Sequence, residues 1–162
     1  MTFAAVSQFI VWLLLCHEAG SSFSSLLPDT RPALLNRTFT SVVIDELIHT
    51  LFPLFTDNNL AVLFKNCLPS TLDTTIFSHT TNPLDTFIIT GDINALWLRD
   101  STNQVIPYLP YVAKDRSLQK LICGLIERQA ESILIDPFAN SFNFNVNKLM
   151  FLIRRVCVCV ST

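Results

Sequence analysis

The chain has 162 residues, of which 50% are hydrophobic and 15% are charged, and its formal net charge is −2. This length suits one domain with a buried core. The near-neutral balance provides no basic surface for nucleic acid or for an anionic membrane. With 3 glycines, the sequence also lacks a glycine-rich loop of the kind that cradles phosphates. Nucleotide and nucleic-acid chemistry are therefore disfavoured.

The first 22 residues have the pattern of a signal peptide. Residues 9–16, FIVWLLLC, form an apolar run that is followed by small and polar residues, AGSSFSS. The run is shorter than the roughly 20 apolar residues that a spanning helix needs. An uncleaved anchor and a buried helix are the alternatives. A signal peptide predicts a secreted or lumenal protein with no stable membrane span, in which Asn36 of the N-R-T sequon would accept a glycan.

The cysteines predict neither a disulfide scaffold nor a zinc site. Cys67, Cys123, Cys157 and Cys159 remain after the first segment, and none of them forms a CxxC pair. Cys67 and Cys123 are best interpreted as small buried hydrophobes. We expect no metal and no cofactor.

The first part of the expected domain contains two short helices and one strand. Val42, Val43, Leu47 and Leu51 recur at helical spacing, and residues 59–67 form a second helical candidate. Residues 70–83 are rich in Ser and Thr, which suits extended chain or a loop. Residues 86–90, TFIIT, are β-branched and aromatic and predict a short strand.

Two longer helices are expected after this strand. Asp92 stands where an N-cap would precede a helix over residues 93–105, which Pro107 would end. Residues 115–135 predict the clearest helix, and Asp136-Pro137 stops it. Its apolar face would contain Leu118, Leu121, Ile122, Leu125 and Ile133, and its solvated face Lys120, Glu127, Arg128 and Glu131. Helices joined by long irregular loops predict an all-α fold.

Residues 91–104, GDINALWLRDSTNQ, concentrate side chains suited to binding a sugar. In a helix over 93–105, Trp97, Asp100 and Gln104 share one face, and Arg99 lies beside them. An indole ring packs on the apolar face of a pyranose, while carboxylate and guanidinium groups hydrogen-bond vicinal hydroxyls. The alternatives are that Trp97 is a core residue, that Asp92 only caps a helix, and that the charges are solvated.

The same stretch resembles a known family. Residues 86–110, TFIITGDINALWLRDSTNQVIPYLP, are similar to the N-terminal signature of glycoside hydrolase family 125, the metal-independent exo-α-1,6-mannosidases. The resemblance continues through LFKNCLPSTLDTT at 63–75 and LICGLIERQAESILIDPFANSFNFN at 121–145. It covers residues 38–145, and the Ser/Thr-rich loops and secretion are similar to fungal members.

The resemblance implies an (α/α)6 barrel, inverting hydrolysis of terminal α-mannosyl residues, and no metal. It places an α-mannoside, or a mannose-containing glycan, in a pocket formed by seven residues. These are Asp92, Trp97, Arg99, Asp100, Gln104, Asp136 and Asn140. Inverting glycosidases use an acid and a base carboxylate, and in this family both lie downstream of the matched segment. No catalytic residue is therefore assigned in this chain.

The expected architecture is the N-terminal part of such a barrel. Family members are longer than this chain, and residues 146–162 resemble nothing in the family, so an unrelated tail from truncation or a retained intron is the hypothesis for them. We expect a fragment of an α-mannosidase that is inactive by itself. The alternatives are a noncatalytic secreted sugar-binding protein and a lumenal interaction protein.

Overall fold

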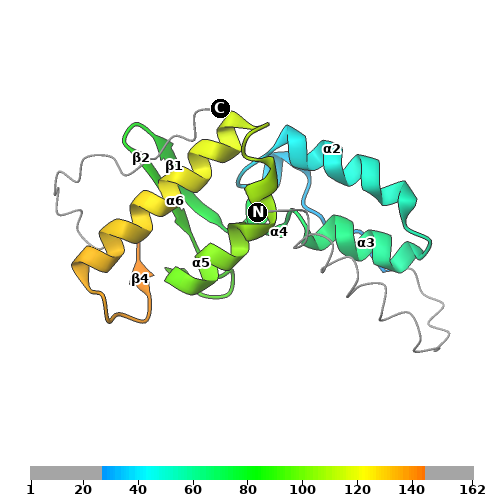
Figure 1. Cartoon of the computed structure of the whole chain (residues 1–162). Coiled ribbons are helices and arrows are strands. Elements are labelled where there is room, and N and C mark those ends of the chain that lie inside the picture. The colour runs from blue at the N-terminus through cyan, green and yellow to red at the C-terminus, as the bar shows by residue number, and fades with distance from the viewer. Residues whose placement is uncertain (1–26, 145–162) are drawn as a thin grey trace.

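The computed structural model describes residues 27–144 (Figure 1). Along the chain the elements are η2 (Leu34–Asn36), α2 (Val42–Leu51), η3 (Phe52–Leu54), α3 (Asn58–Cys67), α4 (Ser70–Thr74), β1 (Ile76–Thr81), β2 (Leu84–Ile88), β3 (Ala95–Leu96), α5 (Leu98–Val105), η4 (Ile106–Tyr111), α6 (Arg116–Ile135) and β4 (Phe142–Asn143). The expected signal peptide, 1–22, and the tail, 146–162, lie outside the described residues. No helix between residues 27 and 144 has the length and apolar character needed to cross a membrane.

The prediction of an all-α fold, as part of an (α/α)6 barrel, is wrong for the described residues. They form a mixed α/β structure, in which β1 and β2 make an antiparallel hairpin and β3 and β4 make a second, two-residue antiparallel pair. The Ser/Thr-rich stretch that suited loop or extended chain supplies α4 and β1, and the Asn82–Pro83 peptide bond in the hairpin turn is cis. β-branched and aromatic residues in this region favour paired strands over helix.

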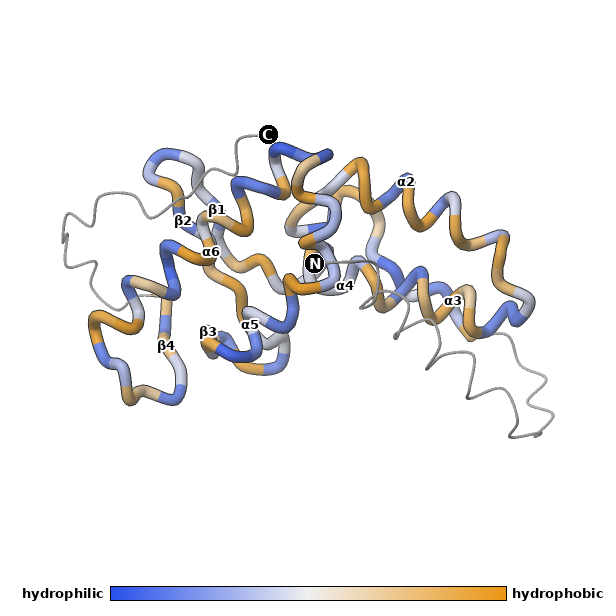
Figure 2. The backbone as a smooth tube through the Cα atoms, in the orientation of Figure 1, coloured by the Kyte–Doolittle hydropathy of each residue, from blue (hydrophilic) through white to orange (hydrophobic). Residues whose placement is uncertain are grey.

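Helix α6 lies across the hairpin and buries one face of β2 (Figure 1). Leu118, Leu121 and Leu125 of α6 are buried with Phe87 and Ile88 of β2 in one hydrophobic core. Figure 2 shows orange and blue alternating along α6 and α2, which is the pattern of helices with one buried face. The core therefore forms around the contact of α6 with β2, and it also includes Ile44 and Ile48 of α2 and Leu72 of α4.

Gly124 allows the close approach of α6 to β2. A Cβ atom at this position would lie 2.5 Å from Thr86 Oγ1 and 3.0 Å from both the Asp85 carbonyl carbon and the Thr86 amide nitrogen. Two of these three atoms belong to the strand backbone and cannot rotate away. The glycine is thus needed for space.

The N-terminal turn of α6 is joined to that of α2. Asp115 Oδ1 accepts hydrogen bonds from the Ser117 and Leu118 amides at 2.9 and 3.1 Å, which begins α6 one residue after the predicted start. Ser41 caps α2 and donates from Oγ to Asp115 Oδ2 at 2.5 Å. Burial raises the pKa of Asp115, but the hydrogen bonds from Ser117 and Ser41 outweigh it and hold the pKa below its usual value.

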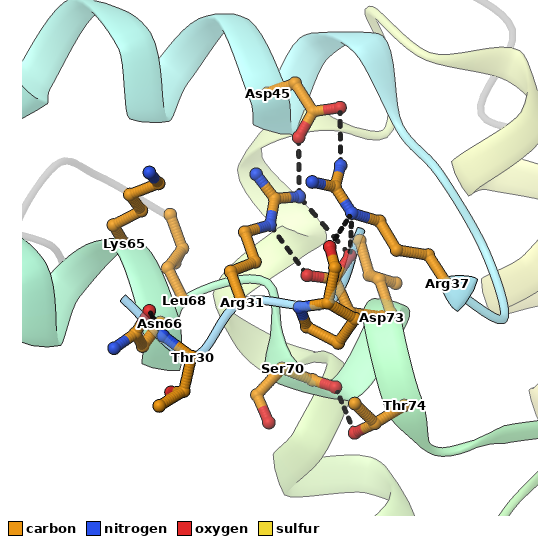
Figure 3. Close-up of polar contacts among 12 residues, drawn as sticks. Thr30, Arg31, Arg37, Asp45, Lys65, Asn66, Leu68, Ser70, Asp73 and Thr74 are labelled. Carbon is orange, nitrogen blue, oxygen red and sulfur yellow. Dashed lines mark hydrogen bonds and ion pairs between the residues drawn. The ribbon is translucent and has the colours of Figure 1, made fainter. Parts of the chain in front are cut away.

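A network of two arginines and two aspartates ties the N-terminal segment to the helices (Figure 3). Arg31 Nε lies 2.7 Å from Asp73 Oδ2, and its Nη2 lies 2.6 Å from Asp45 Oδ1. Arg37 contacts the same two carboxylates at 3.5 and 3.6 Å. Burial lowers the pKa of Arg31, but its hydrogen bonds to Asp73 and Asp45 outweigh this and raise it. The network fixes residues 31–37 against α2 and α4.

Three predictions about individual side chains are wrong. Arg128, expected on the solvated face of α6, is 6% exposed and binds the buried Asp85 through two hydrogen bonds, that from Nε being 2.8 Å long. Ile133, expected in the core, is 47% exposed. Cys67 is exposed, whereas Cys123 is partly buried. For the two positions on α6, the packing of β2 against the helix decides which side chain is covered.

Candidate functional site

The polar stretch 91–104 forms a bend, a short strand and a helix. Gly91 has a φ of +120°, a conformation that favours glycine. Ala95 and Leu96 are buried and pair with Asn143 and Phe142, so α5 begins at Leu98 instead of residue 93. The prediction that Asp92 caps this helix is wrong, because Trp97 holds the N-cap position. Burial of the two apolar residues in the sheet outweighs their helical spacing.

Trp97 occupies the N-cap position without the hydrogen bond that a capping side chain usually provides. Its indole cannot accept a bond from the first amides of α5, and no side-chain cap is formed. The Trp97 Nε1 atom is buried and has no hydrogen-bond partner within the described residues. Buried donors are usually satisfied, so this indole N–H is an exception within the described residues.

The side-chain amide nitrogen of Gln104 donates a hydrogen bond to the segment that follows β2. Its Nε2 donates to the Ile89 carbonyl oxygen at 3.0 Å and approaches Thr75 Oγ1 at 3.4 Å. Its Oε1 is buried and has no partner in the described part of the chain. Gln104 therefore fixes the spacing between α5 and the segment that contains Thr90.

An open hollow of about 350 Å³ lies between α5 and this segment, lined by Thr90, Asp100, Asn103 and Gln104. One carboxylate, two amides and a hydroxyl offer both donors and acceptors to a small polyol or sugar. The structure thus brings together Asp100 and Gln104 of the seven predicted residues. It adds Asn103, which helical spacing from Asp100 could have indicated, and Thr90, for which the sequence held no comparable signal.

The remaining predicted residues are not among those that line the hollow. Arg99 has an 82% exposed side chain and lies 3.7 Å from the Asp100 carboxylate. Asp92 is also exposed. Asp136 and Asn140 are exposed in the loop after α6, where the Asp136 carboxylate accepts a hydrogen bond from the Phe138 amide at 2.9 Å.

The pairing of β3 with β4 brings this loop toward α5. Leu96, directly before Trp97, lies opposite Phe142, which closely follows Asn140. Two segments that are about 45 residues apart in the sequence are therefore paired side by side. Between residues 27 and 144, no group of three or more His, Cys, Asp or Glu side chains is placed to hold a metal ion.

The sequence matches one family model, that of the metal-independent alpha-mannosidases (GH125), over residues 57–151. The match covers more than half of the chain. The chain therefore belongs to glycoside hydrolase family 125.

Two relatives show how much of a family member this chain represents. It is 47% identical over 119 residues to the meiotically up-regulated gene 157 protein of Schizosaccharomyces pombe, covering 72% of this chain and 23% of that protein. It is also similar to a Streptococcus pneumoniae metal-independent alpha mannosidase, solved in a non-productive complex with alpha-1,6-mannobiose. The TM-score is 0.58 at 38% identity, over 66% of this chain and 25% of the other. The chain spans about a quarter of the length of these relatives.

Proposed function

We propose that the hollow along α5 binds the terminal mannose of an α-1,6-mannoside and forms the recognition part of an exo-α-1,6-mannosidase site. The observation that carries the proposal is that Asp100 and Asn103 of α5 line one hollow together with Thr90 and Gln104. Membership in the family, and the mannobiose complex of the similar bacterial protein, support mannose as the sugar.

The chemistry of the lining suits neighbouring hydroxyl groups. The Asp100 carboxylate accepts hydrogen bonds from two adjacent sugar hydroxyls, and such charge-assisted bonds are stronger than neutral ones. The Asn103 amide can donate to one hydroxyl oxygen and accept from another. Arg99, exposed and 3.7 Å from Asp100, can close over the sugar from the solvent side. A site of this kind rejects analogues without hydroxyls, because its polar groups would lose their partners.

We assign recognition rather than bond cleavage to this part of the protein. Inverting glycosidases need an acid and a base carboxylate roughly 6.5–9.5 Å apart, with a water between them. Among the described residues that line the hollow, Asp100 is the one that carries a carboxylate. We expect the chain to bind mannobiose without hydrolysing it, because the lining of the hollow within residues 27–144 supplies a single carboxylate.

Titration of the full chain with α-1,6-mannobiose, followed by NMR, tests the proposal. We expect binding, no release of mannose, and a loss of affinity of about tenfold or more in Asp100→Asn, as for a hydrogen bond to a charged group. Glu46→Gln, an exposed carboxylate change on α2, is the matched control and should bind like wild type. A wild-type chain that does not bind mannobiose, or an Asp100→Asn variant that binds equally well, would refute the proposal.

We further propose that the protein enters the secretory pathway. Asn36 is exposed at the end of η2, so its side chain is accessible to a glycan. Expression in a eukaryotic host followed by endoglycosidase treatment should lower the apparent mass of the wild type and leave Asn36→Gln unchanged. An identical mobility of both proteins before and after treatment would contradict this localisation.

A further inference from the structure

The side chain of Gln129 reaches from α6 to the first turn of α5. Its Nε2 lies 2.8 Å from Ser101 Oγ, 3.0 Å from Thr102 Oγ1 and 3.2 Å from the Leu98 carbonyl oxygen. An amide nitrogen carries two hydrogens, so it serves two of these acceptors at once and shares a hydrogen with the third. One side chain of α6 thus contacts three acceptor groups near the start of α5.

These acceptors require a donor at position 129. Ser101 Oγ donates its own hydrogen to the Trp97 carbonyl oxygen at 2.7 Å, and Thr102 Oγ1 donates to the Leu98 carbonyl oxygen at 2.7 Å. Both hydroxyls therefore present lone pairs to Gln129. A glutamine amide satisfies this arrangement, whereas an ionised glutamate of nearly the same shape would place acceptors against acceptors.

This turn has little other support at its start. The first amides of a helix lack intrahelical partners, and Trp97 gives them no side-chain cap. The same turn carries Arg99 and Asp100, and Asp100 lines the hollow. The contact from Gln129 does not satisfy these first amides, but it ties the turn to α6 through its oxygen atoms.

We infer that Gln129 is a positioning residue, which holds the first turn of α5 so that the Asp100 carboxylate faces the sugar. This inference rests on the proposed function of the hollow. Gln129 is outside the hollow and acts on the sugar through α5. A purely structural role would predict a general loss of stability, whereas a positioning role predicts a local change in α5 together with weaker binding.

The test uses the full ¹⁵N-labelled chain and the variants Gln129→Met and Gln129→Glu. Gln119→Met on the same helix is the matched control, because the Gln119 side chain makes no hydrogen bond within residues 27–144. We measure α-1,6-mannobiose affinity, amide hydrogen exchange along α5 and α6, and the urea midpoint of unfolding. Gln129→Met should bind mannobiose about fivefold more weakly, the effect of losing about one net hydrogen bond. It should also speed exchange at the Ser101 amide.

The amides of α6 and β2 should exchange as in wild type, and Gln119→Met should change neither affinity nor exchange. Gln129→Glu should lose more affinity than Gln129→Met. Unchanged exchange in α5 and unchanged affinity in Gln129→Met would overturn the inference while leaving the proposed function intact. If the wild type does not bind mannobiose, the proposed function fails, and the Ser101 exchange rate still decides whether Gln129 holds the turn.

Discussion

Replacing Gly124 by alanine tests how closely α6 must approach β2. The added Cβ would lie 2.5 Å from Thr86 Oγ1 and 3.0 Å from two backbone atoms of the strand. Real Cβ atoms essentially never come within 3.0 Å of a heavy atom to which they are not bonded, so the contact with Thr86 Oγ1 must be relieved by movement. Thr86 is 0% exposed and its hydroxyl already binds His79 Nδ1 at 2.8 Å, which leaves it little room.

Two opposing effects decide the sign of the change. Alanine is favoured over glycine in a helix interior by about 1 kcal/mol. Overpacking of a filled core costs about 1–3 kcal/mol. The upper part of that range applies, because backbone atoms of β2 cannot rotate away. We therefore expect Gly124→Ala to lower the free energy of unfolding by about 2 kcal/mol.

Urea unfolding followed by circular dichroism measures this difference. With a typical denaturant slope of about 2 kcal/mol/M, the midpoint should fall by about 1 M. In a Thr86→Ala background the penalty should shrink, since the nearest clashing atom is gone. Ala130→Gly on the same helix is the control for helix propensity and should cost about 1 kcal/mol. The packing argument would be refuted if Gly124→Ala were as stable as the wild type. It would also be refuted if the substitution lowered the free energy of unfolding equally in the wild-type and Thr86→Ala backgrounds.

Three further predictions concern polar groups that are buried or partly buried. Arg128→Met should lower the free energy of unfolding by about 3–5 kcal/mol, because Asp85 loses its guanidinium partner in the interior; a urea midpoint close to wild type would contradict this. The pKa of Asp115 is held below its unfolded value by its hydrogen bonds, so its contribution to stability is present above the unfolded pKa and is lost as pH falls through the folded pKa. In Asp115→Asn, the free energy of unfolding should therefore fall less steeply at acid pH than in the wild type. An unchanged acid limb would show that Asp115 does not contribute in this way. Burial raises the pKa of Tyr108 to about 12, and its hydroxyl donates to the Leu68 carbonyl oxygen at 2.6 Å. Ultraviolet difference titration should then show one tyrosine that ionises about two pH units above the ordinary tyrosine pKa. This transition should be absent in Tyr108→Phe. Ionisation of Tyr108 at the ordinary pKa would refute its burial.

Part of the candidate site followed from the sequence alone. The spacing of Asp100 and Gln104 placed both on one helical face, and the structure puts both in the lining of the hollow. Thr90 was not foreseen, because it lies outside α5 and reaches the hollow only through the packing of the strand end. The sugar-binding roles of all seven residues, those of Asp100 and Gln104 included, stay predictions.

Local patterns determined where most helices lie, and only the tertiary structure decided which of their faces are buried. A helix was predicted from the spacing of Val42, Val43, Leu47 and Leu51, and α2 spans Val42–Leu51. Its buried residues are nevertheless Ile44 and Ile48, while Val42 is 70% exposed. Periodicity identifies a helix from its own residues. Which side faces the core depends on partners distant in the sequence, as when Asp85 of β2 draws Arg128 of α6 into the interior. The expected all-α chain is a mixed one because of the β1–β2 hairpin and the pairing of β3 with β4. The second pairing joins distant segments, and backbone hydrogen bonds of that kind leave little trace in the local pattern of either segment.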